Sequence, residues 1–136
     1  MTTLTIGKLA KAGDVRVDTV RYYERMGLIS PLERTESGYR KYSQESIKLL
    51  RFIRKAQSLG FTLEEIKALL ELSEEPEADC ADIREYARNK ITEIESRITD
   101  LLKMKDCLQK LANFCPGEGK PLSECNILKH FYEGDV

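Results

Sequence analysis

Apolar residues recur every three to four positions through most of this chain, which is the spacing of one face of an α-helix. In the first half this spacing predicts four short helices, over residues 5–12, 17–26 and 44–59 and from Leu63 onward. Thr62 and Glu65 fit a capping box at the start of the fourth helix, and Ser43 is the expected cap of the third. An acidic, Pro-containing linker at residues 73–77 then marks the best domain boundary.

A much longer helix is predicted from Ala81 to Phe114, because these 34 residues contain no Gly or Pro and keep their apolar residues at helical spacing. The apolar residues on an alternating 4-3 spacing, which Lys105 interrupts once, are Ala87, Ile91, Ile94, Ile98, Leu101, Leu108 and Ala112. About three heptads of this pattern are typical of a two-stranded coiled coil. The alternative is a helix packed on its own domain. We favour the dimer, because such a lone helix would expose its apolar seam.

The first two short helices are joined by a Gly13-Asp14 turn and form a candidate helix-turn-helix. The segment from Arg34 to Tyr42 alternates around a Ser-Gly turn and interleaves basic and aromatic residues, which predicts a small hairpin or wing. Arg and Lys side chains neutralise phosphates, and Tyr hydroxyls donate to phosphate oxygens. The alternative is that Tyr39 or Tyr42 covers a small core.

The net charge of −1 hides an uneven distribution of charge along the chain. Residues 1–60 hold 12 Lys and Arg against 6 Asp and Glu, whereas residues 61–136 hold 10 against 17. This division indicates that only the first half meets a polyanion, with chance clustering as the alternative. The apolar runs are too short to span a membrane, and the N-terminus lacks the apolar core of a signal peptide. We therefore expect a cytoplasmic protein.

Three of the four cysteines lie near the two ends of the predicted long helix. Cys80 precedes it, and Cys115 and Cys125 follow it. At ~1.5 Å per residue the helix is roughly 50 Å long, so Cys80 cannot meet Cys115 within one subunit. If these thiols act together, two antiparallel chains must bring them together. In the cytosol we expect reduced thiols rather than disulfides.

Five segments, in this order, resemble the MerR family of bacterial transcription regulators over essentially the whole chain. They are Ile6-Gly7-Lys8-Leu9-Ala10, Val20-Arg21-Tyr22-Tyr23-Glu24, Gly27-Leu28, Gly38-Tyr39-Arg40-Lys41-Tyr42 and Leu59-Gly60-Phe61-Thr62-Leu63-Glu64-Glu65-Ile66. The resemblance implies a mainly α fold with three parts. These are a winged helix-turn-helix DNA-binding domain (1–75), a long antiparallel coiled-coil dimerisation helix (80–114), and a metal-binding loop with a short terminal helix (115–136).

The resemblance also implies how the chain meets DNA, with the second helix in the major groove and the wing on phosphates. The residues carried over by position are Asp18, Thr19, Arg21, Tyr22 and Tyr23 on the second helix, and Arg34, Tyr39, Arg40 and Tyr42 on the wing. For Tyr23 the alternative to a DNA contact is a place in the core. The implied partners are double-stranded palindromic promoter DNA, RNA polymerase at that promoter and a second copy of the chain.

Within the family the chain resembles the divalent heavy-metal-sensing branch, which implies Cys80, Cys115 and Cys125 as metal ligands. The family's monovalent copper-type sensors lack a cysteine at the Cys80 position. Its zinc-type sensors have a further loop cysteine where this chain has Pro116, and a histidine, whereas His130 lies past the loop. Three sulfur ligands therefore favour mercury, lead or cadmium over zinc, and the metal stays open.

The remaining polar candidates are less specific. Asp79, Glu118 or Glu124 offers an oxygen ligand, and Leu122 to Phe131 is expected to form the terminal helix. We expect Cys107, in the middle of the long helix, to pack rather than bind metal. The function that follows is a heavy-metal-resistance activator that distorts promoter DNA when metal binds. The alternative is a thiol–disulfide redox-sensing regulator. The sequence shows no nucleophile–base set and no phosphate-binding loop, so we do not expect an enzyme.

Overall fold

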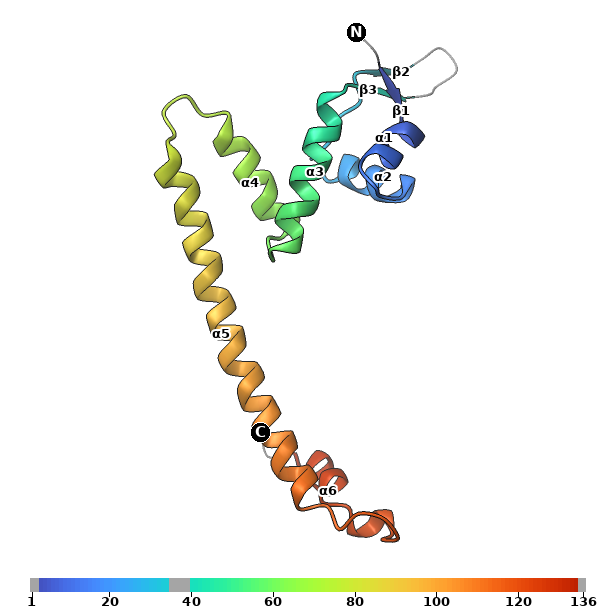
Figure 1. Ribbon diagram of the computed structural model, residues 1–136, viewed down its shortest axis with the longest axis vertical. Helices are drawn as coiled ribbons and strands as arrows, with labels where there is room; N and C mark the ends of the chain where they lie inside the picture. Colours follow the sequence, from blue (N-terminus) through green and yellow to red (C-terminus); the bar gives the residue numbers. More distant parts are fainter. Residues whose placement is uncertain (1–2, 35–39, 135–136) are drawn as a thin grey trace. The chain divides into compact units, whose positions relative to one another are not determined.

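The computed structural model describes residues 3–34 and 40–134 of the 136-residue chain. It contains two compact units, residues 1–90 and 91–136. The first unit holds a small sheet and four helices, as the ribbon in Figure 1 shows. Its helices are α1 (Ile6–Ala12), α2 (Val17–Arg25), α3 (Glu45–Ser58) and α4 (Leu63–Ser73), together with the start of α5 (Cys80–Asn113). Its strands are β1 (Leu4–Thr5), β2 (Glu33–Arg34) and β3 (Arg40–Tyr42).

The strands form an antiparallel sheet in the order β1-β3-β2, with Leu4 opposite Tyr42 and Arg34 opposite Arg40. The β2–β3 pairing confirms the predicted hairpin, while its turn at Ser37-Gly38 lies outside the described residues. The sequence did not predict β1, because a two-residue strand is too short to show alternation.

Capping residues fix where the helices of the first unit begin. The Thr5 side chain accepts from the Lys8 backbone N–H at 3.3 Å and starts α1. The predicted capping box of α4 is present: the Thr62 hydroxyl accepts from the Glu65 N–H at 3.2 Å, and the Glu65 carboxylate accepts from the Thr62 N–H at 2.8 Å. The expectation that Ser43 caps α3 is wrong, since Gln44 holds that position without a side-chain bond.

The core of the first unit joins all four short helices to the sheet. Its fully buried side chains are Leu9, Val20, Ile29, Tyr42, Leu50, Ile53 and Ile66. Burying each of the aliphatic ones contributes about 1.5–3 kcal/mol. The α1–α2 turn approaches this core so closely that a Cβ on Gly13 would fall 2.2 Å from a Leu50 methyl carbon. Glycine is therefore required there, and it fixes how the helix-turn-helix sits on α3.

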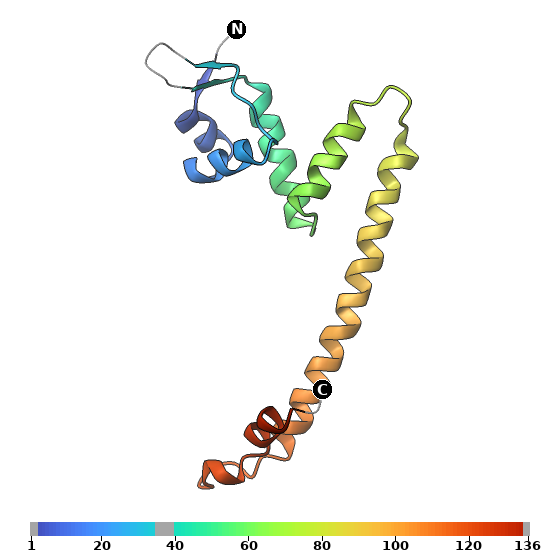
Figure 2. The same cartoon turned by 180° about the vertical axis from the view of Figure 1, so that it is seen from behind.

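The second unit contains the rest of α5, a 3₁₀ turn at Leu122–Glu124 and α6 (Asn126–Glu133). The bounds of α5 confirm the predicted long helix to within one residue at each end. The expected terminal helix is instead broken at Cys125, which adopts an extended conformation. Figures 1 and 2 show α6 beside the C-terminal end of α5. No helix in the described part of the chain is long and apolar enough to cross a membrane.

Candidate DNA-binding surface and metal-binding loop

Helix α2 presents four of its five predicted DNA contacts away from the core. Asp18, Arg21 and Tyr22 are exposed and Thr19 is half-buried. Asp18 and Arg21 lie 4.0 Å apart, and both are more than half exposed, so their pairing is weak and leaves the guanidinium available to a phosphate. The Arg25 guanidinium lies 5.9 Å from the centre of the Tyr22 ring. This face therefore combines positive charge with an exposed aromatic ring, which suits contact with a polyanion.

Tyr23 points the other way, into the core. It is only 4% exposed, and its hydroxyl donates to the Gln57 side chain at 2.6 Å. Burial raises the pKa of Tyr23 above its ordinary value of 10.0. The expected DNA contact from Tyr23 does not fit this position, because a phosphate cannot reach a buried hydroxyl that already has a partner. Its structural alternative, a place in the core, fits.

The wing strand β3 carries a second correction. Tyr42 is fully buried, and its hydroxyl donates to one oxygen of Glu24, while the Arg40 guanidinium donates to the other. Burial, followed by the bond to Glu24, raises the pKa of Tyr42 to about 12. Tyr42 therefore ties the wing to α2 in place of the expected phosphate contact. The side chain of Arg34 and the whole of Tyr39 lie outside the described residues.

Glu24 is a residue whose role the sequence did not predict. Its carboxylate is largely buried between α2 and the wing, where it receives the Arg40 and Tyr42 bonds. The available signal was its position four residues after Val20, on the inner face of α2. An acidic residue there needs partners from another element, because a buried carboxylate is costly without them. The wing supplies two such partners, the Arg40 guanidinium and the Tyr42 hydroxyl.

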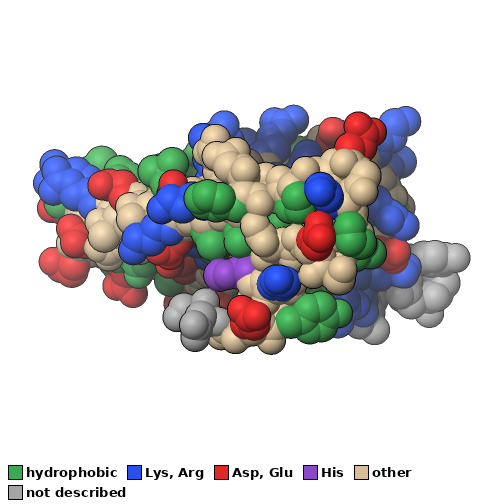
Figure 3. Space-filling model, turned by 90° about the horizontal axis from the view of Figure 1, so that it is seen from below, with side chains coloured by type: hydrophobic (Ala, Val, Ile, Leu, Met, Phe, Trp, Pro, Cys, Tyr) green, Lys and Arg blue, Asp and Glu red, His purple; other side chains and the backbone are tan. Residues whose placement is uncertain are grey.

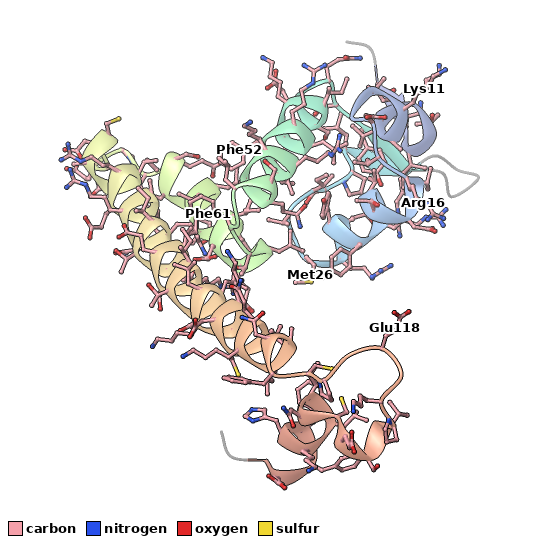
Figure 4. All side chains as sticks on the ribbon, turned by 60° about the horizontal axis from the view of Figure 1, so that its bottom comes forward. Lys11, Arg16, Met26, Phe52, Phe61 and Glu118 are labelled. Carbon is pink, nitrogen blue, oxygen red and sulfur yellow. The ribbon has the colours of Figure 1, made fainter. Side chains whose placement is uncertain are left out.

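Cationic side chains continue around the helix-turn-helix and onto α3. In Figure 4, Lys11 and Arg16 project outwards from the ends of α1 and α2. On α3 the Arg54 guanidinium donates to the Gly13 carbonyl at 3.0 Å and so holds the turn between the two helices. The exposed basic residues of α3 are Lys48, Arg51, Arg54 and Lys55. A positive surface of this kind supplies the non-specific part of DNA affinity.

A partly buried ion pair joins the start of α5 to α4. Lys90 is 6% exposed, and its Nζ donates to the Glu65 carboxylate at 2.8 Å while lying 5.3 Å from the Phe61 ring centre. The Lys90 bond, followed by the bond from the Thr62 N–H, lowers the pKa of Glu65 below 4.5. The same carboxylate therefore caps α4 and holds α5. The sequence pattern did not single out Lys90.

Cys80 is the first residue of α5 and is exposed. The neighbouring Asp79 acts as the helix cap, since one carboxylate oxygen accepts from the Ala81 and Asp82 backbone N–H groups at 3.0 and 3.3 Å. One of the two Asp79 carboxylate oxygens, considered as metal ligands, therefore already accepts these two hydrogen bonds. The cap also fixes where Cys80 leaves the linker, because it sets the first turn of the helix.

In the loop after α5, a residue next to Cys115 is bonded to a residue next to Cys125. Cys115 and Cys125 are half-buried free thiols. The Asn126 side chain donates to the Phe114 carbonyl at 2.6 Å, so the residue after Cys125 is bonded to the residue before Cys115. Gly117 and Gly119 have φ values of 85° and 82°, which only glycine adopts readily. The sequence expectation of a tight loop between these thiols fits this geometry.

The other loop candidates lie differently. Figure 4 shows Glu118 projecting outwards from the loop, and Glu124 ends the 3₁₀ turn just before Cys125. Cys107, expected to pack, is exposed in the single chain, and its Sγ lies 4.0 Å from Nε2 of His130. Among the described residues of this chain, no three His, Cys, Asp or Glu side chains gather into a metal-binding cluster.

Comparisons with known proteins agree with this layout. Residues 4–73 match the family model described as MerR HTH family regulatory protein, and residues 47–111 match the model described as MerR, DNA binding. The chain is 45% identical over 124 residues to the mercuric resistance operon regulatory protein of Bacillus cereus, covering 91% of this chain and 93% of that protein. It is 38% identical over 130 residues to the HTH-type transcriptional regulator ZntR of Escherichia coli K12, covering 95% and 92%.

A solved structure is similar over nearly the whole length. It is the transcription regulator PbrR691 from Ralstonia metallidurans CH34 in complex with lead(II), with a TM-score of 0.83 and 31% identity, covering 94% of this chain and 98% of that one. The similarity, at this coverage, reaches the N-terminal head (residues 1–75), the long helix α5 and the loop segment that follows it.

Proposed function

The chain belongs to the MerR family of helix-turn-helix regulators, and from that premise we propose that it activates transcription when a soft divalent metal ion binds to it. Proteins of this family are transcription regulators and not enzymes. The proposed ligands are Cys115 and Cys125 of one subunit and the partner subunit's Cys80. As a regulator of bacterial promoters, the protein would act in the cytoplasm.

The observation that carries this proposal is the loop closed by Asn126. Its 2.6 Å bond to the Phe114 carbonyl holds the two ends of the loop together. The half-buried thiols lie just inside these ends, because Cys115 follows Phe114 and Cys125 precedes Asn126. Thiolates are soft ligands that select soft ions, and each thiol releases its proton to solvent when it binds the metal. Cys125 also holds the N-cap position of α6, without a side-chain hydrogen bond, so a metal-bound thiolate there would lie at the positive end of that helix.

The proposed metals are mercury, lead and cadmium ahead of zinc. The Bacillus cereus relative is named for mercuric resistance, and PbrR691 was solved with lead(II). The absence of a loop histidine and the presence of Pro116 argue against a two-ion zinc site. These relatives are metal-responsive regulators, which does not favour the thiol–disulfide alternative.

The proposed mechanism uses a homodimer in which two α5 helices pack antiparallel. The apolar residues of the expected seam support it, because Ile91, Ile94 and Ile98 are 40–53% exposed in the single chain. The metal supplies an attraction between thiolates of two subunits. A shift of α5 would reach α4 through the Lys90–Glu65 pair and so reorient the head. The two heads would then bend and underwind the palindromic promoter for RNA polymerase.

The test measures transcription from the cognate promoter and metal affinity on the reduced protein. Cys80→Ser, Cys115→Ser and Cys125→Ser should each abolish activation by mercury(II) or lead(II), whereas the matched control Cys107→Ser should retain it. Normal activation by all three variants would refute the proposal. Mild peroxide should yield no Cys115–Cys125 disulfide that activates transcription without metal.

The role of the loop closure has its own measurement. Asn126→Ala should weaken mercury(II) or lead(II) binding several-fold, because the loop must be ordered at the time of binding. Asn113→Ala, at the end of α5, is the matched control and should bind as the parent does. Equal affinities for the two variants would show that this bond does not organise the site.

A further inference from the structure

Cys107 and His130 form a second soft-donor pair, separate from the loop thiols. Cys107 lies on α5 and His130 on α6, 23 residues later, and their Sγ and Nε2 atoms are 4.0 Å apart. Both side chains line one groove of about 810 Å³ within the second unit. In Figure 3 the histidine, drawn in purple, lies beside hydrophobic side chains in green. Two elements therefore bring a thiol and an imidazole to one cavity.

The groove around this pair is almost entirely apolar. Its other lining residues are Lys103, Met104, Leu108, Leu111, Phe131 and Gly134. Met104 lies three residues before Cys107 on α5, so its thioether is on the same face of the helix. The groove thus offers a thiol, an imidazole and a thioether, which are the donors that soft ions prefer. Leu108 also belongs to the expected seam of the dimer, so the groove borders that interface.

We propose that Cys107 and His130 bind one monovalent soft ion of the Cu(I) or Ag(I) class, with Met104 as an additional weak donor. The distance between the two donors fits a low coordination number. With the bond lengths that zinc makes to sulfur and nitrogen, about 2.3 and 2.0 Å, a 4.0 Å separation would require an angle of about 135° at the metal. This is wider than the tetrahedral angle, which zinc prefers in sites with four protein ligands.

Charge favours a monovalent ion over a divalent one. Binding releases the Cys107 proton to solvent, and the resulting thiolate with a monovalent ion is neutral. A divalent ion with one thiolate would leave a net positive charge in an apolar groove, which is costly. Among the described residues that line the groove, Lys103 has the only charged side chain, and its ammonium would repel such a charge. The proposed site therefore prefers a monovalent ion, whereas the loop thiols are proposed to bind a divalent one.

The test uses full-length protein with Cys80, Cys115 and Cys125 replaced by serine, so that Cys107 is the one thiol left. Silver nitrate is the probe, titrated against glutathione as competitor, with native mass spectrometry for stoichiometry. We expect one Ag(I) per chain. His130→Gln in this background should weaken binding at least tenfold, and Met104→Leu should weaken it by a smaller factor. Circular dichroism checks that every variant keeps its helices.

The control variant is Cys107→Ser in the same background, which should bind no Ag(I) in the presence of glutathione. The ¹⁵N chemical shift of Nε2 in His130 should move on silver binding. Unchanged affinity in His130→Gln, or an unmoved Nε2 signal, would show an ordinary free thiol and overturn the proposal. The result does not depend on the proposed divalent site, whose cysteines are absent from every protein in this test.

Discussion

At the scale of single residues, Tyr42 separates a structural role from a DNA-binding one. Its ring is fully buried and its hydroxyl donates to Glu24. Tyr42→Phe keeps the ring and removes that bond to a carboxylate, so we expect the free energy of unfolding to fall by about 1.5–3 kcal/mol. Because the hydroxyl does not face solvent, the salt dependence of operator binding should not change. Chemical denaturation and an operator titration at several salt concentrations measure the two effects.

A lost phosphate contact would give a different result for this variant. The slope of log affinity against log salt would become shallower while the unfolding midpoint stayed the same. That outcome would return Tyr42 to the DNA-binding surface. Sequence spacing could not decide between these roles, because it identifies the inner face of α2 but not which wing tyrosine reaches it.

The Glu65–Lys90 pair supports a prediction about stability and acid. Glu65→Ala should cost about 1–3 kcal/mol, because it removes the carboxylate beside a buried ammonium as well as a cap bond of α4. Lys90→Met keeps the apolar stem, so adding it to Glu65→Ala should recover part of the loss. Glu64→Ala, in the same helical turn and exposed, is the matched control. Urea unfolding of the parent, Glu65→Ala, Lys90→Met and the double variant completes the cycle, with Glu64→Ala measured beside it.

The pH dependence of this pair has a definite sign. The pKa of Glu65 is lowered in the folded protein, chiefly by Lys90, below the ordinary value of 4.5. Its contribution to stability is therefore fully present above pH 4.5 and is lost as the pH falls through the lowered pKa. Glu65→Gln should lose less stability than the parent over that acidic range. An equal or larger loss in the variant would contradict the assigned pairing.

At the scale of elements, α2 is the part of the head expected to meet DNA most closely. Arg21 is exposed on its outer face and only weakly paired with Asp18. Arg21→Gln should weaken operator binding and reduce the salt slope by about 1 for each head, as expected for one lost phosphate contact. Arg97→Gln, on α5 outside the head, is the control for net charge and should leave the slope unchanged. Binding titrations over a range of salt concentrations distinguish the two.

The elements that the sequence predicted best are those with local signals. The capping box of Thr62 and Glu65 lies within one helical turn, and α5 forms from one uninterrupted stretch of the chain, so local pattern sufficed for both. The elements it missed depend on distant partners. Strand β1 is ordered by pairing with β3, and the break before α6 accompanies the Asn126 bond to Phe114. Neither partner is visible in local periodicity.

The candidate sites divide in the same way. The expected tight loop between Cys115 and Cys125 followed from its glycines and prolines, which act locally. The closeness of Cys107 to His130 could not be predicted, because it depends on the path by which the loop returns α6 to α5. A single histidine outside the expected ligand pattern gave no sequence signal for that contact.

At the scale of the whole molecule, the proposed function requires two chains. In the single chain the seam of α5 is exposed, with Leu101 at 61%. A coiled coil would cover these side chains, since apolar residues at 3.5-residue spacing pack against a second helix. The proposed palindromic operator and the proposed shared metal site would each depend on that same association. Disrupting the seam should therefore remove both functions together.

Leu101→Lys tests this dependence directly. In a homodimer the change occurs twice, and each lost leucine burial removes about 1.5–3 kcal/mol, so the dimer dissociation constant should rise by at least about 100-fold. Leu102→Lys is the matched control: Leu102 is 59% exposed but lies beside the predicted seam, so it should have a smaller effect. Sedimentation equilibrium gives the constants, and operator binding and lead(II) affinity should fall in parallel with dimer population. A Leu101→Lys protein that stays dimeric would place the seam on another face of α5.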